Sequence, residues 1–157
     1  MSELATVALA VPADARPIAE MSRDLIEHGL NWAWTPARVG HFIAGRESCV
    51  VVARRDRHLA AFAIMHLGDD VAHLNLLAVA PSHRRQGLSR QLMDWLTATA
   101  LEAGVLRIDL ELRAQNEAAR AFYAALGFSD TGKVSGYYQG REAALRMSRS
   151  LALRTAP

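Results

Sequence analysis

The sequence has little of what disulfide-bonded or membrane-spanning proteins need. It contains a single cysteine, Cys49, so no disulfide can form within the chain, and a reducing compartment is expected. Cys49 lies in an apolar run and is predicted to be a core thiol. Arg, Asp or His interrupts every apolar stretch before it is long enough to span a bilayer. The N-terminal apolar stretch has no basic segment before it, so it is predicted to be a strand and not a signal peptide.

Repeats, low-complexity tracts and linkers are also lacking, which predicts one domain over residues 1–157. Hydrophobic residues make up 51% of the chain and charged residues 22%, as in ordinary globular proteins. The net charge of +2 permits an anionic ligand but does not predict the broad basic surface of a nucleic-acid-binding protein.

Hydrophobic periodicity predicts alternating strands and helices. Strands are predicted at 4–10, 48–55, 58–67, 72–80, 106–113, 128–134 and 142–148. Three helices are predicted to be capped by the residue before them: one by Asp14, one by Thr35, to about Ala44, and one by Asn116, to about Leu126. A further helix is predicted from about Gln86 to Ala103, with an apolar stripe formed by Leu88, Leu92, Trp95 and Leu96. The order β-α-α-β-β-β-α-β-α-β-β predicts an α/β protein with a mixed sheet and helices on its faces.

The segment VAPSHRRQGLSR, Val79–Arg90, places three arginines and a glycine where a helix is predicted to begin. The first turn of a helix has unsatisfied backbone N–H groups and a partial positive charge, which favour an anion such as a pyrophosphate. Gly87 has no side chain, so phosphates can approach the backbone closely there. The alternative is a solvated, basic helix start.

Two segments carry a family resemblance. Arg84–Ser89, RRQGLS, is similar to the pyrophosphate loop Arg/Gln-x-x-Gly-x-Gly/Ala of the GNAT superfamily of N-acetyltransferases. Asn116–Phe128 resembles that family's element with Asn, a Tyr seven residues later, and a terminal Gly-Phe. Within the superfamily the chain is most similar to the bacterial ribosomal-protein alanine N-acetyltransferase group, with which it shares LAVAP, RRQGLSR, LELRAQN, FYAALGF and GYYQGREAALRM.

The resemblance implies a GNAT-type, largely antiparallel central sheet with helices on both faces and a splay between the fourth and fifth strands. It also implies acetyl-CoA as the cofactor, with no metal ligands. The loop residues would hold the pyrophosphate, while the strand backbone before the loop would pair with the pantetheine arm. The implied cofactor-binding residues are Leu77, Ala78, Val79, Arg85, Gln86, Gly87, Leu88, Ser89, Arg90 and Asn116.

Acetyl transfer from a thioester needs a neutral amine, since an ammonium has no lone pair, and a general base assists it. The resemblance assigns this base to Glu111; the alternative is a solvated strand carboxylate, which is the expectation for Asp109. His73 is a second base candidate, or else a structural strand histidine.

The leaving thiolate benefits from a proton, and the resemblance assigns the acid to Tyr123. Phe122 and Leu126 are predicted to supply the packing face of the same helix, which would leave Tyr123 available for this role.

The resemblance also points to an acceptor site. Tyr137 and Tyr138 resemble a tyrosine pair beside the peptide groove of N-terminal acetyltransferases. Trp32 and Trp34 lie in the loop that usually forms the opposite wall, although a place in the hydrophobic core is an equal alternative for each.

The acceptor is predicted to be a protein or peptide N-terminal α-amine, with a small-molecule amine as the alternative. Two other function classes remain open: a non-catalytic acyl-CoA-binding domain, and a nucleic-acid-binding module that uses His83–Arg90. We expect a cytoplasmic monomer or homodimer without nucleic-acid or membrane partners.

Overall fold

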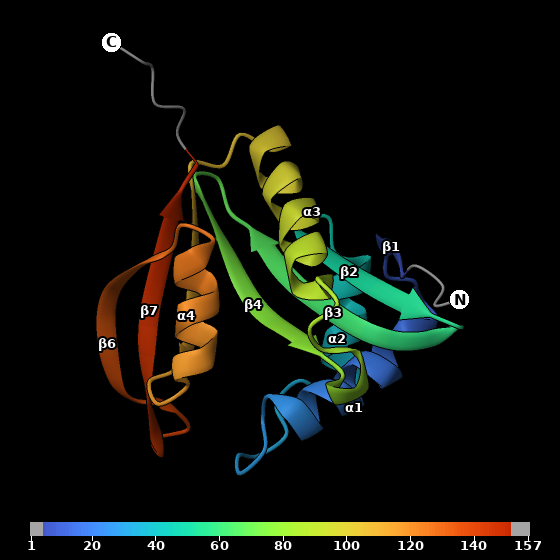
Figure 1. Ribbon diagram of the computed structural model, residues 1–157, viewed down its shortest axis with the longest axis horizontal. Coiled ribbons are helices and arrows are strands. Elements are labelled where there is room, and N and C mark those ends of the chain that lie inside the picture. The colour runs from blue at the N-terminus through green and yellow to red at the C-terminus, as the bar shows by residue number, and fades with distance from the viewer. Residues whose placement is uncertain (1–4, 152–157) are drawn as a thin grey trace. The chain divides into compact units, whose positions relative to one another are not determined.

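The computed structural model describes residues 5–151, and its elements follow the predicted order (Figure 1). The strands are β1 (Thr6–Leu9), β2 (Ser48–Arg55), β3 (His58–Leu67), β4 (Val71–Val79), β5 (Arg107–Arg113), β6 (Ser129–Tyr138) and β7 (Glu142–Ser150). The helices are α1 (Ala15–Leu25), α2 (Pro36–Ala44), α3 (Leu88–Glu102) and α4 (Glu117–Ala125), with short 3-10 turns η1 (Pro12–Asp14) and η2 (Pro81–His83). Residue 4, the first of the predicted N-terminal strand, lies outside the described residues.

The hydrogen-bonded strand order is β1-β2-β3-β4-β5-β7-β6. The pairs β1–β2, β2–β3, β5–β7 and β6–β7 are antiparallel, whereas β4 and β5 are parallel. The parallel register that they share pairs Val71–Leu74 with Arg107–Leu110. The predicted mixed, largely antiparallel sheet is confirmed.

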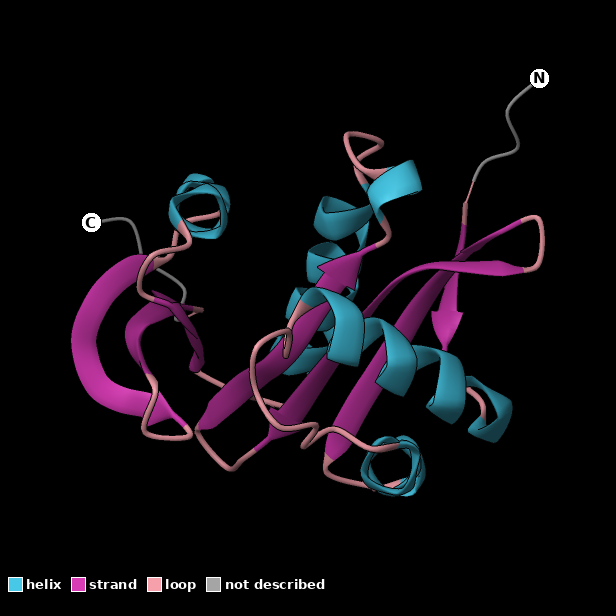
Figure 2. Cartoon of the chain, turned by 90° about the horizontal axis from the view of Figure 1, so that it is seen from below, coloured by secondary structure: helices cyan, strands magenta, loops and turns pink. Residues whose placement is uncertain are grey.

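The contacts divide the chain into two compact units. Among the described residues, the first unit comprises 5–66 together with Asn75–Thr99, and the second comprises Leu67–Leu74 together with 100–151. In the first unit, α1 and α2 lie on one face of the strands and α3 lies on the opposite face (Figure 2).

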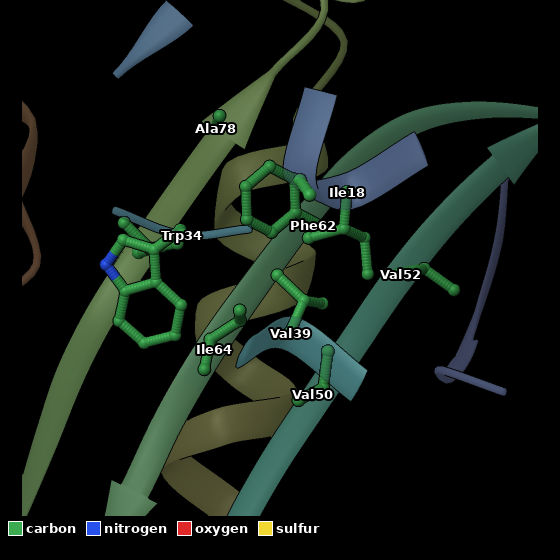
Figure 3. Packing of buried hydrophobic residues seen from close by; sticks show 10 residues of the cluster. Ile18, Trp34, Val39, Val50, Val52, Phe62, Ile64 and Ala78 are labelled. Atoms are coloured by element: carbon green, nitrogen blue, oxygen red, sulfur yellow. The ribbon is translucent and has the colours of Figure 1, made fainter. Parts of the chain in front are cut away.

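The core under α1 and α2 is built from alternate residues of the strands, because residues i and i+2 of a strand face the same side. Figure 3 shows Val50 and Val52 of β2 and Phe62 and Ile64 of β3 directed toward the helices. Val51 lies on the other face of β2 and is equally buried, so both faces of the strands are covered. The buried members of this core are Ile18, Ala19, Trp34, Val39, Val50, Val52, Phe62, Ile64, Leu76 and Ala78.

Local capping predictions had mixed outcomes in the first unit. Thr35 caps α2 as predicted, since its hydroxyl accepts from the Arg38 N–H at 3.3 Å. Asp14 precedes α1 but does not cap it with its side chain. Its carboxylate instead accepts from the Val11 N–H at 2.8 Å and pairs with Arg54, because the strand arginine offers a charged partner.

The predicted apolar stripe of α3 is partly wrong. Leu88, Leu92 and Leu96 are buried as expected, but Trp95 is 37% exposed and Met93 is buried instead. A stripe of residues four apart drifts around the helix, since a turn takes 3.6 residues, and this drift brings Met93 inward and leaves Trp95 on the outer flank.

The second unit contains β5, β7 and β6, the first half of β4, and α4. Ile108, Leu110 and Leu112 are buried, as the alternation in β5 predicted. Strand β6 continues past the predicted end at Val134, because an irregularity that includes Gly136, with φ 65°, lets pairing resume at Tyr138.

The predicted packing face of α4 is wrong. Tyr123 is the buried residue of this helix, while Phe122 and Leu126 are half-buried. After Gly127 the chain turns back, and the Phe128 ring packs 5.6 Å from the Tyr123 ring. This burial depends on the following strand, which helical periodicity does not report.

Candidate functional site

The loop between β4 and α3 has the backbone geometry of an open anion site. Arg85 and Gly87 both have positive φ, 62° and 76°, so α3 begins at Leu88 and not at the predicted Gln86. Leu88 is buried and anchors the helix. A Cβ at Gly87 would meet no atom within 4 Å, so the space above the loop is open. The N–H groups of the first turn of α3, including those of Ser89 and Arg90, lie at the N-terminal end of the helix, which attracts anions.

A ligand arm can bind as an added strand only along an edge whose backbone groups are not used by the neighbouring strand. The β4 residues before this loop have such an edge on the side of β5. Ala78 is buried with Leu76 in the first unit's core, whereas Leu77 and Val79 are half-buried on the opposite face. The register of β4 with β5 does not reach Leu77, Ala78 or Val79. Their backbone groups on that edge are therefore not used by this ladder.

Glu111 lies in a cluster of charged side chains in the second unit. The β5–β7 register places it opposite Arg146, whose Nε donates to Oε1 at 3.3 Å. Nε2 of His73 on β4 lies at hydrogen-bonding distance from Oε2. Burial raises the pKa of the Glu111 carboxyl, but His73 and Arg146 outweigh burial and hold the pKa below its usual value. Glu111 is therefore ionised at neutral pH.

Asp109 shares the strand face of Glu111 but has other partners. Its carboxylate accepts from Nε of Arg107 at 2.7 Å and from the Ser148 hydroxyl at 2.6 Å. Burial raises the pKa of Asp109, but these hydrogen bonds and the charges of Arg107 and His73 outweigh burial and hold the pKa below its usual value. Asp109 is thus held by partners and is not the solvated carboxylate that we expected.

Tyr137 and Tyr138 lie in the same unit, at the end of β6. Their rings meet edge to face with centroids 4.9 Å apart. The Arg113 guanidinium, which pairs with Glu142 at 3.2 Å, lies 5.9 Å from the centre of the Tyr138 ring. Burial raises the pKa of both tyrosines, and the charge of Glu111 raises it further. The pair therefore lies within the electrostatic field of the predicted base.

Tyr123 and Asn116 belong to α4 and its cap. The Tyr123 side chain is buried, and burial raises the pKa of its hydroxyl far above the usual value, so the hydroxyl stays protonated. Asn116 caps the helix as predicted, because its Oδ1 accepts from the Ala119 N–H at 3.1 Å.

The two tryptophans of the α1–α2 loop have different places. Trp34 is buried in the core of the first unit, where Figure 3 shows it beside Ile64 and where its ring lies 4.9 Å from that of Phe42. The core alternative therefore holds for Trp34, and its assignment to the acceptor wall is corrected. Trp32 is half-buried, and its Nε1 donates to the Ala19 carbonyl at 3.2 Å.

The loop is held by a residue that the sequence did not predict. Glu27 is 6% exposed, and its Oε1 accepts from the backbone N–H groups of Ala33 at 2.7 Å and Trp34 at 3.1 Å. Its Oε2 accepts from the Ser22 hydroxyl at 2.8 Å. An acidic residue just after an apolar helix face was the available signal, but the sequence alone also fits an exposed helix end.

Replacing Glu27 with Ala should lower the free energy of unfolding by about 2–4 kcal/mol, because the Trp34 N–H and the Ser22 hydroxyl, both buried, and the Ala33 N–H lose their acceptor. Urea denaturation measures this loss. The exposed Glu47 offers a matched control, and Glu47→Ala should change stability by less than about 0.5 kcal/mol. Equal stability of the two variants would contradict the role assigned to Glu27.

Other kinds of site are not evident within residues 5–151. No group of three or more His, Cys, Asp or Glu side chains could hold a metal ion in this range. One pocket of about 540 Å³ lies in the second unit beside α4, around the Arg120–Asp130 ion pair, and none of the predicted site residues lines it.

Comparison with known proteins agrees with this fold. Residues 18–128 match the acetyltransferase (GNAT) family, and the chain belongs to this family. It is similar to the [ribosomal protein bS18]-alanine N-acetyltransferase of Escherichia coli strain K12, with 40% identity over 98 residues. That match spans 60% of this chain and 66% of the relative, just under two thirds of the relative's length.

Solved structures extend the similarity to nearly the whole chain. The crystal structure of the ribosomal-protein-S18-alanine N-acetyltransferase from Escherichia coli superposes with a TM-score of 0.82 and 28% identity, and covers 96% of each chain. The crystal structure of nourseothricin acetyltransferase has a TM-score of 0.64 and 30% identity, and covers 68% of this chain and 67% of that one.

Proposed function

We propose that the protein is an acetyl-CoA-dependent N-acetyltransferase that acetylates the N-terminal α-amine of a protein or peptide. The observation that carries this proposal is the loop Arg84–Arg90 of a GNAT family member, with its left-handed Gly87 and the open first turn of α3. A helix start of this kind suits a pyrophosphate. The match to the family runs through both compact units, which supports one acetyltransferase domain over the chain.

The cofactor roles follow from the backbone and the charges. The first-turn N–H groups of α3, with Arg85 and Arg90, would bind the pyrophosphate. The edge of Leu77–Val79 would bind the pantetheine arm as an added strand. A backbone N–H on this edge would polarise the thioester carbonyl, a role that usually contributes strongly to acyl transfer. Asn116 would contact the cofactor in addition to capping α4.

The catalytic roles follow from protonation states. The ionised Glu111 is in the correct state to receive the proton of the attacking amine, directly or through a water. Tyr123 keeps its proton and would donate it to the departing coenzyme A sulfur as the C–S bond breaks. A neutral amine attacks, which favours an α-amine with a pKa of about 8 over a lysine amine at about 10.4.

The choice of acceptor rests on two observations. The chain is similar to an enzyme named for the alanine of a ribosomal protein, and the paired rings of Tyr137 and Tyr138 belong to the same unit as Glu111. A small-molecule amine is the second candidate, because the chain is also similar to nourseothricin acetyltransferase.

An acetyl-transfer assay that measures coenzyme A release tests the function and the acceptor together. Peptides that begin with small residues should have higher kcat/KM than polyamines, amino acids or aminoglycosides. Efficient turnover of a polyamine or amino acid, with peptides inert, would refute the peptide acceptor. Wild-type protein that releases coenzyme A with none of these amines would refute the acetyltransferase.

Tyr138→Ala should raise the KM for a peptide about threefold to tenfold, since aromatic contacts of this kind contribute about 0.5–1.5 kcal/mol. Steady-state kinetics with varied peptide concentration measure this change. Tyr138→Phe keeps the ring and should leave KM near the wild-type value. An unchanged KM in Tyr138→Ala would remove the tyrosine from the acceptor site.

Cytoplasmic location and a monomeric or homodimeric state, without nucleic-acid or membrane partners, complete the proposal. The single cysteine, buried in β2, suits a reducing compartment. Within residues 5–151, no helix combines the length and the apolar character needed to cross a membrane.

A further inference from the structure

Arg146 on β7 is the outer partner of the proposed base. Its Nε donates to Oε1 of Glu111 at 3.3 Å, and its side chain is 51% exposed, while that of Glu111 is 12% exposed. The antiparallel register of β5 and β7 places the two residues directly opposite each other. Solvent thus reaches the arginine more readily than the carboxylate, so an acceptor whose amine reaches Glu111 has this guanidinium beside it.

The guanidinium of Arg146 is only partly used by this contact. Among residues 5–151, its two terminal nitrogens have no hydrogen-bond partner. Two other arginines of the second unit differ, because Arg107 and Arg120 each engage an aspartate through Nε and a terminal nitrogen together. Such a fork is a frequent geometry of an arginine–carboxylate pair. Arg146 therefore keeps terminal N–H groups that can bind a further carboxylate.

The other carboxylates on this face of β5 and β7 already have partners. Asp109 and Glu142 each pair with an arginine of β5. The charge of Arg146 partly offsets the rise in the pKa of Tyr137, so the guanidinium lies near the tyrosine pair assigned to the acceptor. A carboxylate that binds Arg146 is thus expected to come from the acceptor.

Such a carboxylate would gain importance as the reaction proceeds. When Glu111 takes the proton of the attacking amine, its negative charge disappears, and Arg146 loses the anion with which it is paired. A carboxylate of the acceptor, bound to the terminal nitrogens by charge-assisted hydrogen bonds, would remain as the counter-ion. An interaction that becomes stronger in the transition state raises the rate.

We propose that Arg146 selects acceptors with a carboxylate close to the reacting amine, namely peptides with Asp or Glu at the second position. This inference rests on the proposed acetyltransferase activity, with Glu111 as its base. A basic second residue should be disfavoured, because its charge would lie beside the guanidinium.

The distance between the two contacts favours the second residue. The path from the amine to Glu111, across to Arg146 and out to a bound carboxylate has three hydrogen-bonded steps of about 3 Å each. The amine and the carboxylate are therefore several ångströms apart. Two residues of extended chain cover such a distance, since each spans roughly 3.3 Å.

Two matched peptides test the proposal. Both begin with Ala, and they differ only at the second residue, which is Glu or Gln. With the wild type, kcat/KM for the Glu peptide should exceed that for the Gln peptide about tenfold, since hydrogen bonds between charged groups are the stronger ones. In Arg146→Gln the two values should be equal. Any effect of this variant on Glu111 cancels in the ratio, because both peptides use the same base.

Equal kcat/KM of the two peptides with the wild type would overturn the proposal, and so would an unchanged ratio in Arg146→Gln. Arg120 offers a matched control, since it belongs to the same unit, is similarly exposed and pairs with Asp130. Arg120→Gln should keep the wild-type ratio. Loss of the ratio in this control would mean that the selectivity follows the total charge of the unit and not Arg146.

Free amino acids are the other source of an amine with a nearby carboxylate. Free alanine should have a lower kcat/KM than the Glu peptide, because both of its groups lie on one carbon and span too short a distance. Alanine amide, which lacks the carboxylate, is its control. If free alanine is the better substrate, and Arg146→Gln removes its advantage over alanine amide, Arg146 binds an α-carboxylate and the second-residue assignment is wrong.

Failure of the proposed function would look different, because the wild type would then transfer no acetyl group to either peptide. Binding can still be measured without transfer, by calorimetric titration of each peptide into the protein with coenzyme A present. The Glu peptide should have the lower Kd with the wild type, and Arg146→Gln should remove the difference. Equal Kd values with the wild type would contradict the carboxylate site itself.

Discussion

Glu111→Gln should lower kcat by about 10²–10⁴-fold while the affinity for acetyl-CoA changes little. Glutamine has nearly the shape of glutamate, and its amide oxygen can still accept from one of the two partners, so the strands should keep their pairing. It has no negative charge, however, and cannot receive the proton of the attacking amine. Initial rates of coenzyme A release measure kcat, and calorimetry measures the cofactor affinity.

The neighbouring carboxylate offers a matched control for this prediction. Asp109 lies two residues before Glu111 on the same face of β5, and its partners are Arg107 and Ser148. Asp109→Asn removes a charge of the same sign from the same strand and should lower kcat less than about tenfold. Equal losses in the two variants would mean that the rate follows the total charge of the strand face and not the proposed proton transfer.

Gly87→Val should raise the Kd for acetyl-CoA by at least about tenfold, because the new side chain would occupy the place where the phosphates approach the backbone. The structure gives two reasons. Gly87 has φ 76°, which a β-branched residue adopts only with strain, and its Cβ would point into the open space of the proposed pyrophosphate site. Calorimetric titration with acetyl-CoA measures the change.

Gly104 provides the control for backbone strain. It follows α3, has φ 79°, and its Cβ would likewise meet no atom within 4 Å. Gly104→Val should therefore lower the free energy of unfolding about as much as Gly87→Val does, by about 1–2 kcal/mol. It should leave the Kd for acetyl-CoA unchanged. If both variants lose stability equally and both keep the wild-type Kd, the loop before α3 does not bind the cofactor.

The sequence predicted well those features that depend on neighbours in the chain. The order of strands and helices, the caps at Thr35 and Asn116, and the glycine at the start of α3 all follow from local patterns. Burial within β5 was also predictable, because strict alternation of apolar residues has one interpretation in a strand. The family motifs belong to the same category, since each is a short, continuous stretch.

Features that depend on contacts between distant segments were predicted less well. The buried place of Tyr123 requires the turn at Gly127 that returns Phe128 to its ring, and the core position of Trp34 requires α2 and the sheet. Periodicity treats Trp32 and Trp34 alike, because they are two residues apart in an irregular loop. Glu27 is similar: its acceptor role exists only when that loop folds back over it.

The sequence by itself determined the family, the element order and the identity of the carboxylate at position 111. Only the tertiary structure decided what surrounds that carboxylate. His73 and Arg146 lie 38 and 35 residues away in the chain, and they meet Glu111 because the parallel register of β4 and the antiparallel register of β7 flank β5. Hydrophobic patterns determine which face of a strand is buried, but the register between strands determines which charges meet on the other face. Those charges in turn determine the protonation state of Glu111.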